Sequence, residues 1–253
     1  MTLTFLGTGT STGVPVIGCK CRVCASKDPR DKRLRTSALL DTKCGTRILF
    51  DCGPDFRQQS MDKDFRPFDA ILLTHEHYDH VGGLDDLRPY STFGNQQIYA
   101  NHLCLKHLRE RMPYCFGMKT PSGVPQLELH EAFSGQPFQV NELTILPIEV
   151  MHGPLPILGY RIADFAYITD LKTISNESKS MLHGVETFVL NALRHRPHVT
   201  HQTIDEAICL SQELGAKQTY LIHFNHDAPL HAEAEELLPS NVHFAYDGLQ
   251  IEV

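Results

Sequence analysis

Short apolar runs separated by turn residues dominate the chain. Most of these runs have the length of a strand and are too short for an ordinary helix. We expect strands over residues 3–6, 47–50, 70–73, 97–100, 143–150, 159–162, 165–169, 187–190, 218–222 and 243–246.

Apolar residues at helical spacing are confined to fewer segments, at residues 101–111, 203–214 and 231–238. Asn101 and Thr203 are of the types that cap helix N-termini, and Gly215 is of the type that ends a helix. Strands come in runs and helices come late in each half of the chain. This order predicts an α/β fold in which helices cover sheets from the outside.

No tandem repeat, low-complexity tract or linker divides the sequence, so we expect a single domain over residues 1–253. Residues 115–125 contain several glycines and prolines and are expected to form a flexible loop.

The composition narrows the class of protein. Of 253 residues, 42% are apolar and 21% are charged, as in ordinary soluble enzymes. A formal net charge of −7 argues against broad attraction to nucleic acid backbones. No apolar run approaches the roughly 20 residues that span a bilayer, and the first residues lack the features of a signal peptide. We therefore expect a cytoplasmic protein with neither a membrane nor a nucleic acid as partner.

Fifteen histidines are the main departure from ordinary composition, and several follow the strand expected at residues 70–73. Residues 74–80 read T-H-E-H-Y-D-H. A strand end followed by a tight loop can direct His75 and His77 toward one metal, while Asp79 and His80 turn toward a second. Nitrogen and carboxylate ligands suit Zn, Mn or Fe. A histidine-rich surface loop is the alternative, which this dense spacing after a buried strand disfavours.

The motif resembles the H-x-H-x-D-H signature of the metallo-β-lactamase superfamily. The resemblance continues along the chain, because His152, Asp170 and His223 each end or follow an expected strand in the family's order. It implies an αβ/βα four-layer sandwich, in which two mixed β-sheets pack face to face with helices outside. It implies two active-site metal ions, one bound by His75, His77 and His152, the other by Asp79, His80 and His223, with Asp170 between them.

A second group of candidate ligands lies near the N-terminus, where Cys19, Cys21 and Cys24 form a C-x-C-x-x-C motif. Three thiolates this close need a fourth ligand to complete a tetrahedral structural zinc site. His226, three residues after His223, is a candidate. The alternative is three reduced thiols at the surface.

This cysteine motif and the opening Gly-Thr-Gly loop resemble the PhnP-type branch, the phosphoribosyl 1,2-cyclic phosphate phosphodiesterase-like enzymes. In that branch a histidine before a Thr- or Asp-capped helix is the general acid, and His201 matches its position, with His198 as a competitor. Asp51 matches a family aspartate that orients the metal loop. The implied reaction is hydrolysis of a small, cyclic phosphate ester by a metal-bridging hydroxide, with Asp79 holding the water or accepting its proton.

Other functions stay open at this point. The first alternative is a tRNA 3′-processing endonuclease, a class that the PhnP-type enzymes resemble. These endonucleases usually carry a basic arm that grips the tRNA, and no such insertion is visible in this sequence. A thioester or lactam hydrolase and a non-catalytic, metal-stabilised binding protein are further alternatives. The sequence identifies no substrate-binding residues, and it leaves the metal (Zn, Mn or Fe) and the oligomeric state open, with a homodimer as one option.

Overall fold

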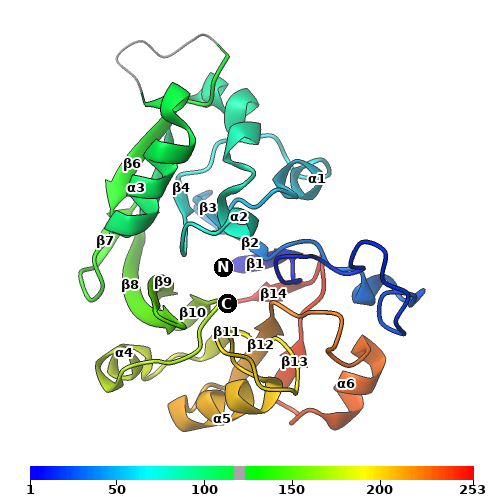
Figure 1. The fold of residues 1–253 in the computed structure, drawn as a ribbon. Helices are drawn as coiled ribbons and strands as arrows, with labels where there is room; N and C mark the ends of the chain where they lie inside the picture. The colour runs from blue at the N-terminus through cyan, green and yellow to red at the C-terminus, as the bar shows by residue number, and fades with distance from the viewer. Residues whose placement is uncertain (117–122) are drawn as a thin grey trace.

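The computed structural model of the protein describes residues 1–116 and 123–253. Within this part of the chain the strands form two seven-stranded sheets that pack face to face (Figure 1). The first sheet has the order β14-β1-β2-β3-β4-β5-β6 and the second has the order β13-β12-β11-β10-β9-β8-β7. Both sheets are mixed, because β3 to β6 and β10 to β13 are parallel whereas their remaining neighbours are antiparallel.

The strands of the first sheet are β1 (Thr2–Gly7), β2 (Ser37–Asp41), β3 (Arg47–Phe50), β4 (Ala70–Leu72), β5 (Gln96–Ala100), β6 (Leu127–Glu131) and β14 (Gln250–Glu252). Those of the second are β7 (Phe138–Val140), β8 (Leu143–His152), β9 (Leu155–Ile162), β10 (Phe165–Ile168), β11 (Thr187–Asn191), β12 (Gln218–Ile222) and β13 (Val242–Phe244).

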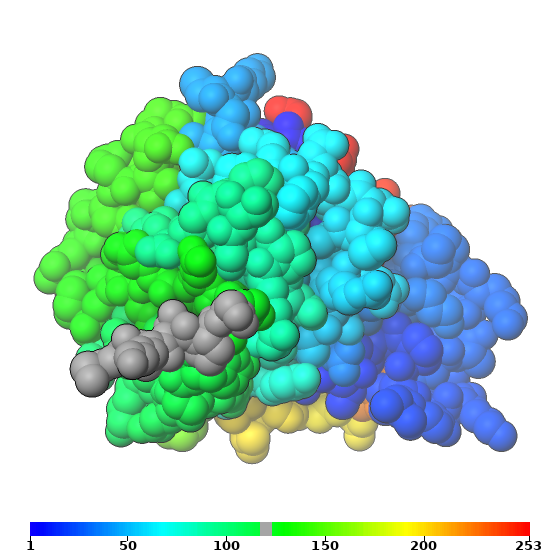
Figure 2. Space-filling view, turned by 90° about the horizontal axis from the view of Figure 1, so that it is seen from above, coloured from blue at the N-terminus to red at the C-terminus, as the bar shows by residue number. Residues whose placement is uncertain are grey.

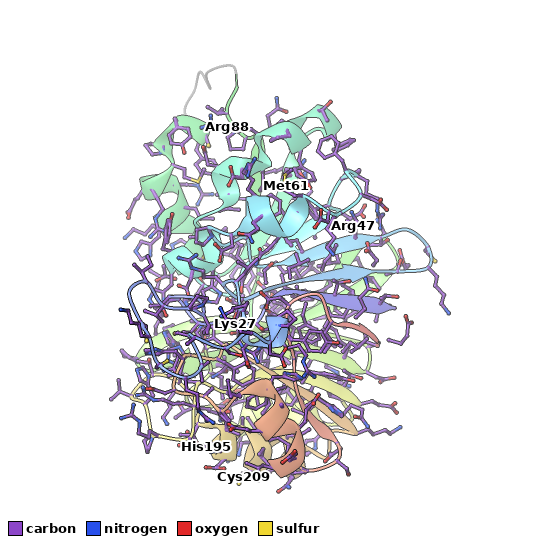
Figure 3. All side chains as sticks on the ribbon, turned by 90° about the vertical axis from the view of Figure 1, so that its right-hand side faces the viewer. Lys27, Arg47, Met61, Arg88, His195 and Cys209 are labelled. Atoms are coloured by element: carbon purple, nitrogen blue, oxygen red, sulfur yellow. The ribbon has the colours of Figure 1, made fainter. Side chains whose placement is uncertain are left out.

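Helices cover the outer face of each sheet. The first sheet carries α1 (Phe56–Ser60), α2 (Tyr78–Val81), α3 (His102–Arg111) and the 3-10 helices η2 (Leu84–Phe93) and η3 (Pro113–Cys115). The second carries α4 (Asn176–Leu182), α5 (Ile204–Leu214) and α6 (His231–Leu237). A further 3-10 helix, η1 (Pro29–Asp31), lies in the N-terminal loop. In Figure 3, Met61 and Arg88 lie at one end of the molecule, whereas His195 and Cys209 lie at the opposite end.

The strand β3 shows how the sequence produces these layers. Ile48 and Phe50 belong to the core between the sheets, whereas Leu49 belongs to the core under the helices. Both faces of the strand are therefore buried, which explains a continuous apolar run in place of alternation. Phe50 stacks on Tyr167 of the second sheet, with 4.6 Å between ring centroids.

The expected α/β four-layer sandwich is confirmed. The helices expected from Asn101 and Thr203 begin after these residues, and each cap side chain accepts a hydrogen bond from the backbone. Strands β2, β6, β7 and β14 were not expected from the pattern. Of these, β6 lies at the edge of its sheet with no fully buried residue, and β7 and β14 are short.

Two further expectations concern the course of the chain. The flexible loop expected at residues 115–125 falls largely on residues 117–122, which lie outside the described residues. No helix in the described part of the chain is long and apolar enough to cross a bilayer. Figure 2 shows the N-terminal segment, in dark blue, projecting on one side of the molecule, away from the green segments near residue 130.

The core between the sheets yields a direct test of the packing. We expect Phe50→Ala to lower the free energy of unfolding by about 3–5 kcal/mol, because the lost ring leaves a cavity in this core. Urea denaturation measures the change, and Phe65→Ala is the matched control, because Phe65 is 56% exposed. Equal effects of the two substitutions would contradict the packing described here.

Candidate metal centre

The candidate ligands lie at or just beyond the C-terminal ends of strands from both sheets. His75 and His77 follow β4, and the short helix α2 that comes next carries Asp79 and His80. In the second sheet, β8 ends at His152, Asp170 follows β10, and His223 comes directly after β12. Strand ends from two packed sheets thus meet at one edge of the sandwich.

Several of these turns need unusual backbone conformations. Asp51, Asp170 and His223 have φ values of 56°, 56° and 63°, in the left-handed region that non-glycine residues seldom adopt. Such conformations cost about 1–3 kcal/mol each and persist only where neighbouring structure holds them. Beside His223, the backbone of Phe224 donates to Thr8 O at 3.0 Å, and Thr10 N donates to Phe224 O at 2.9 Å.

The first group of candidate ligands consists of His75, His77 and His152, with ligand atoms within 4.8 Å of one another. The Nε2 atom of His75 lies 2.9 Å from Nδ1 of His77. Nδ1 of His152 lies 2.9 Å from two backbone carbonyl oxygens, those of Asp170 and Thr200. Since carbonyls only accept, this nitrogen carries the proton and Nε2 of His152 is free to bind a cation.

The second group consists of Asp79, His80 and His223. Oδ2 of Asp79 lies 3.2 Å from Nε2 of His80 and 3.6 Å from Nε2 of His223. Asp170 lies between the two groups, with Oδ2 3.2 Å from Nε2 of His80 and Oδ1 3.2 Å from Nε2 of His223. It also forms a ligand group with His75 and His80. The structure thus brings together all the residues that the sequence assigned to two metal ions.

Asp51 lies behind these ligands and is fully buried. Its Oδ2 atom is 2.7 Å from Nδ1 of His80, and its Oδ1 atom accepts a 2.8 Å hydrogen bond from the backbone of Thr74. Thr74 Oγ1 in turn lies 3.0 Å from Nδ1 of His75. A carboxylate in this place fixes the ring orientation of His80 and leaves Nε2 facing the other ligands. Thr74 was not singled out from the sequence, although it directly precedes the motif.

The metal loop packs tightly against the chain that follows β3. Cys52 N donates to His80 O at 2.8 Å, and Gly83 N donates to Cys52 O at 2.9 Å. A Cβ atom at Gly53 would lie 2.1 Å from the carbonyl oxygen of Asp79, so only glycine fits there. This close approach fixes the backbone of Asp79 and His80 against the residues that follow β3.

The electrostatics of the cluster favour bound cations. Burial disfavours the ionised forms of Asp79 and Asp170, yet the neighbouring histidines hold both carboxyl pKa values below their ordinary range. Burial likewise opposes protonation of His80, but the carboxylates of Asp79, Asp170 and Asp51 raise its pKa well above the ordinary value. Within the described residues, histidines are the only ion-pair partners of these carboxylates.

Unpartnered atoms point to the same conclusion. Nε2 of His80 and both ring nitrogens of His223 are buried without a hydrogen-bond partner in the described part of the structure. Buried polar atoms normally have a partner. A cation bound between these imidazole nitrogens and the nearby carboxylates would provide one for each nitrogen that faces the site. The donor set therefore fits two divalent transition metal ions.

His201 lies at the edge of this cluster. Its Nε2 atom is 2.9 Å from Oδ1 of Asp170, and its Nδ1 atom is 3.0 Å from Nδ1 of His198 and 3.0 Å from Oγ1 of Thr200. Burial lowers the pKa of His201 to about 4, although the hydrogen bond to Asp170 opposes this effect. His198 lies behind His201, whereas the side chain of His195 is 53% exposed and pairs with Asp205.

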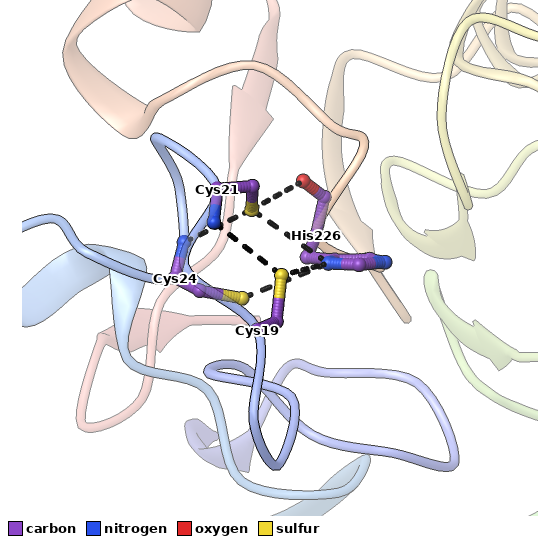
Figure 4. Close-up of side chains that lie close together, drawn as sticks. All are labelled: Cys19, Cys21, Cys24 and His226. Atoms are coloured by element: carbon purple, nitrogen blue, oxygen red, sulfur yellow. Dashed lines mark hydrogen bonds between the residues drawn. The ribbon is translucent and has the colours of Figure 1, made fainter.

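The cysteine cluster is a separate candidate zinc site (Figure 4). The Sγ atoms of Cys19, Cys21 and Cys24 lie 3.2, 3.7 and 3.7 Å from Nδ1 of His226. Ligand bonds of about 2.0–2.3 Å to a tetrahedral zinc require separations close to these. The Cys24 backbone N–H lowers the pKa of Cys21 to about 6, whereas burial raises the pKa of Cys24 to about 11. The four side chains thus fit one zinc ion that joins the N-terminal loop to the segment after β12.

Arginine side chains are common contacts of phosphate groups, but three arginines near the candidate site form ion pairs with aspartates instead. Arg35 pairs with Asp55 at 2.7 Å, and Arg194 and Arg196 both pair with Asp227, at 2.8 and 2.6 Å. Asp227 was not singled out from the sequence, and its position directly after His226 is the signal that would have drawn attention to it.

Comparisons with known proteins agree with this geometry. A family model described as a beta-lactamase superfamily domain matches residues 46–224. A PhnP-family diphosphatase of known structure superposes with a TM-score of 0.92 at 40% identity, over 100% of this chain and 97% of that chain. Zn²⁺-bound PqqB from Methylobacterium extorquens has a TM-score of 0.84 at 18% identity over 100% of both chains, which shows the shared fold alone.

Among curated proteins, an octanoyltransferase of Porphyromonas gingivalis is 49% identical over 246 residues. The match covers 97% of this chain but 50% of that protein, so the chain spans about half the length of this relative. Together, the family model, the two sheets and the PhnP-family neighbour show that the chain belongs to the β-lactamase superfamily, in its PhnP-like branch.

Proposed function

We propose that the protein hydrolyses a phosphorus–oxygen bond in a small substrate. The phosphorus atom of this substrate carries two substituents linked through oxygen, as in a phosphodiester. A cyclic phosphate ester is the form favoured by the sequence, and the name of the diphosphatase relative adds a diphosphate linkage to the same class. The observation that carries the proposal is the placement of His201, whose Nε2 atom lies 2.9 Å from Asp170 beside the metal ligands.

We assign the candidate ligands to two metal ions according to the groups that they form in the structure. His75, His77 and His152 would hold one ion, and Asp79, His80 and His223 the other, with Asp170 shared. Two divalent ions bound there would supply Lewis acidity and lower the pKa of a water molecule between them. Zinc, manganese and iron all suit this donor set. The cysteine cluster would hold one structural zinc.

The protein's own groups orient the reactants and move protons. Asp79 is largely buried but keeps 8% of its surface exposed, so a water molecule can reach its carboxylate and donate a hydrogen bond to it. His201 would donate a proton to the leaving oxygen. Because burial lowers the pKa of His201 to about 4, the free imidazole is neutral near pH 7. An anionic phosphate beside the ring would raise that pKa and favour the protonated form that donates to the leaving oxygen.

An acyl-transfer function has weaker support. The relative named octanoyltransferase is twice as long as the aligned segment, so its name can describe its other half. Cys52, the cysteine nearest Asp51 in sequence, is fully buried, and burial raises its pKa well above the ordinary value, which makes it a poor nucleophile.

Substrate preference tests the proposed reaction. We expect the metal-loaded protein to hydrolyse bis(p-nitrophenyl) phosphate, a diester, at least about tenfold faster than p-nitrophenyl phosphate, a difference of ~1.4 kcal/mol in activation free energy. Release of p-nitrophenolate measures both rates. Parallel assays with a thioester, a lactam and a tRNA precursor cover the other hydrolase functions. Preference for one of these, or no turnover by protein that binds its metals, would contradict the proposal.

The role of His201 has its own test. We expect His201→Ala to lower kcat for diphenyl phosphate by about 10²–10⁴, because phenolate is a basic leaving group that needs a proton. The loss should be smaller for bis(p-nitrophenyl) phosphate, since p-nitrophenolate leaves without one. Metal analysis should show unchanged content, and His195→Ala is the control. Full activity of His201→Ala on diphenyl phosphate would show that the general acid is another group.

A further inference from the structure

The loop that carries His201 is held mainly at its base. We define the acid loop as residues 193–202. Leu193 N donates to Gln202 O at 3.0 Å and closes the loop, and Ile204 N at the start of α5 donates to Arg194 O at 3.0 Å. These hydrogen bonds fix the two ends of the acid loop, but not the residues between them.

The middle of the acid loop has few tethers. Among the described residues, the backbone groups of residues 195–199 make no hydrogen bond to the chain outside the loop. Val199 is 83% exposed, so the tip is not packed into a core. The carbonyl of Thr200 lies 2.9 Å from Nδ1 of His152, and His195 lies 3.4 Å from Asp205 at the surface. The position of the acid loop therefore depends more on side-chain ion pairs than the position of a packed loop would.

Asp227 supplies the shortest of these ion pairs. A single oxygen atom, Oδ2, accepts from Nη1 of Arg194 at 2.8 Å and from Nη2 of Arg196 at 2.6 Å. The Arg194 side chain is only 20% exposed and that of Asp227 is 34% exposed, so solvent screens the Arg194 pair less than an ordinary surface pair. Arg194 also donates through Nε to Arg196 O at 3.3 Å, which joins the two arginines into one unit.

Asp227 is itself held by the segment that carries two candidate metal ligands. It directly follows His226 of the cysteine cluster and lies four residues after His223. Asp227 N donates to Oδ1 of Asn225 at 2.9 Å, and Asn225 N donates to Leu193 O at 3.1 Å. In Figure 4 the segment bearing His226 meets the N-terminal loop at the cysteine cluster.

We infer that Asp227 is a positioning residue, which transmits the anchorage of the cysteine cluster to the acid loop and so holds His201 beside Asp170. The inference rests on the proposed role of His201 as general acid. It assigns Arg194 and Arg196 to this tether, in place of the phosphate contact that their charge suggests. An error of about 1 Å in the placement of a catalytic group can cost 10²-fold in rate, so a small shift of the loop matters.

The isosteric change Asp227→Asn tests the inference, because it removes the charge and keeps the shape. For diphenyl phosphate we expect kcat to fall by about 10- to 100-fold, with KM changed less than about twofold. For bis(p-nitrophenyl) phosphate the loss should be small, because its leaving group needs no general acid. Asp205→Asn is the matched control, since Asp205 also contacts the acid loop but only through exposed His195.

A double-mutant cycle separates positioning from general destabilisation. In the His201→Ala background, we expect Asp227→Asn to change kcat by less than about twofold, because the two substitutions act on the same step. Equal losses on both diesters, or additive losses in the double mutant, would overturn the inference. So would unchanged turnover of diphenyl phosphate by Asp227→Asn.

A second variant guards against damage to the zinc segment. Arg194→Gln combined with Arg196→Gln breaks the same ion pairs from the loop side and leaves residues 223–228 untouched. This double variant should lose turnover of diphenyl phosphate but little turnover of bis(p-nitrophenyl) phosphate, as Asp227→Asn does, while its zinc content stays unchanged. Unchanged turnover of diphenyl phosphate by the double variant would overturn the inference. If the wild-type protein hydrolyses neither diester, the proposed function fails. If wild type and His201→Ala behave as expected, only the role of Asp227 is in question.

Discussion

Buried negative charge is the constraint on which the site depends. Asp51, Asp79 and Asp170 lie where the two sheets meet, each less than a tenth exposed, and histidines are their only ion-pair partners in the described part of the structure. Burying unpaired carboxylates is costly, so the cluster needs positive charge. In the absence of metal His80 is driven to hold a proton, and divalent ions meet the same need while using the free imidazole lone pairs.

The fold supplies this arrangement through its strand ends. Strands β3, β4, β10 and β12 end at the same edge of the sandwich, and Asp51, His75, Asp170 and His223 follow them. The left-handed backbone at Asp51, Asp170 and His223 makes these turns abrupt. The cysteine cluster adds a second anchor, because it joins the N-terminal loop to the segment between His223 and Asp227. Rigid placement of ligands and of His201 therefore comes from the sheets and from this anchor together.

Much of this arrangement could be predicted from the sequence. The T-H-E-H-Y-D-H segment after a buried strand predicted the centre, and the resemblance to the metallo-β-lactamase superfamily implied His152, Asp170 and His223 as the other ligands. The tethers could not be predicted, because the pairing of Asp227 with Arg194 depends on how distant loops fold together. Edge strand β6 was missed although Leu127 and Leu129 alternate with polar residues, because five residues with only two apolar side chains give a weak strand signal. Short β7 and β14 have too few residues to show any period.

Anomalous X-ray diffraction from crystals of protein purified without chelator tests the central claim most directly. Data at the Zn, Mn and Fe absorption edges locate and identify each bound metal. We expect one peak among His75, His77 and His152, a second among Asp79, His80 and His223, and a zinc peak at the cysteine cluster. An intact fold with no anomalous peak around Asp170, even after soaking with these metals, would contradict the account.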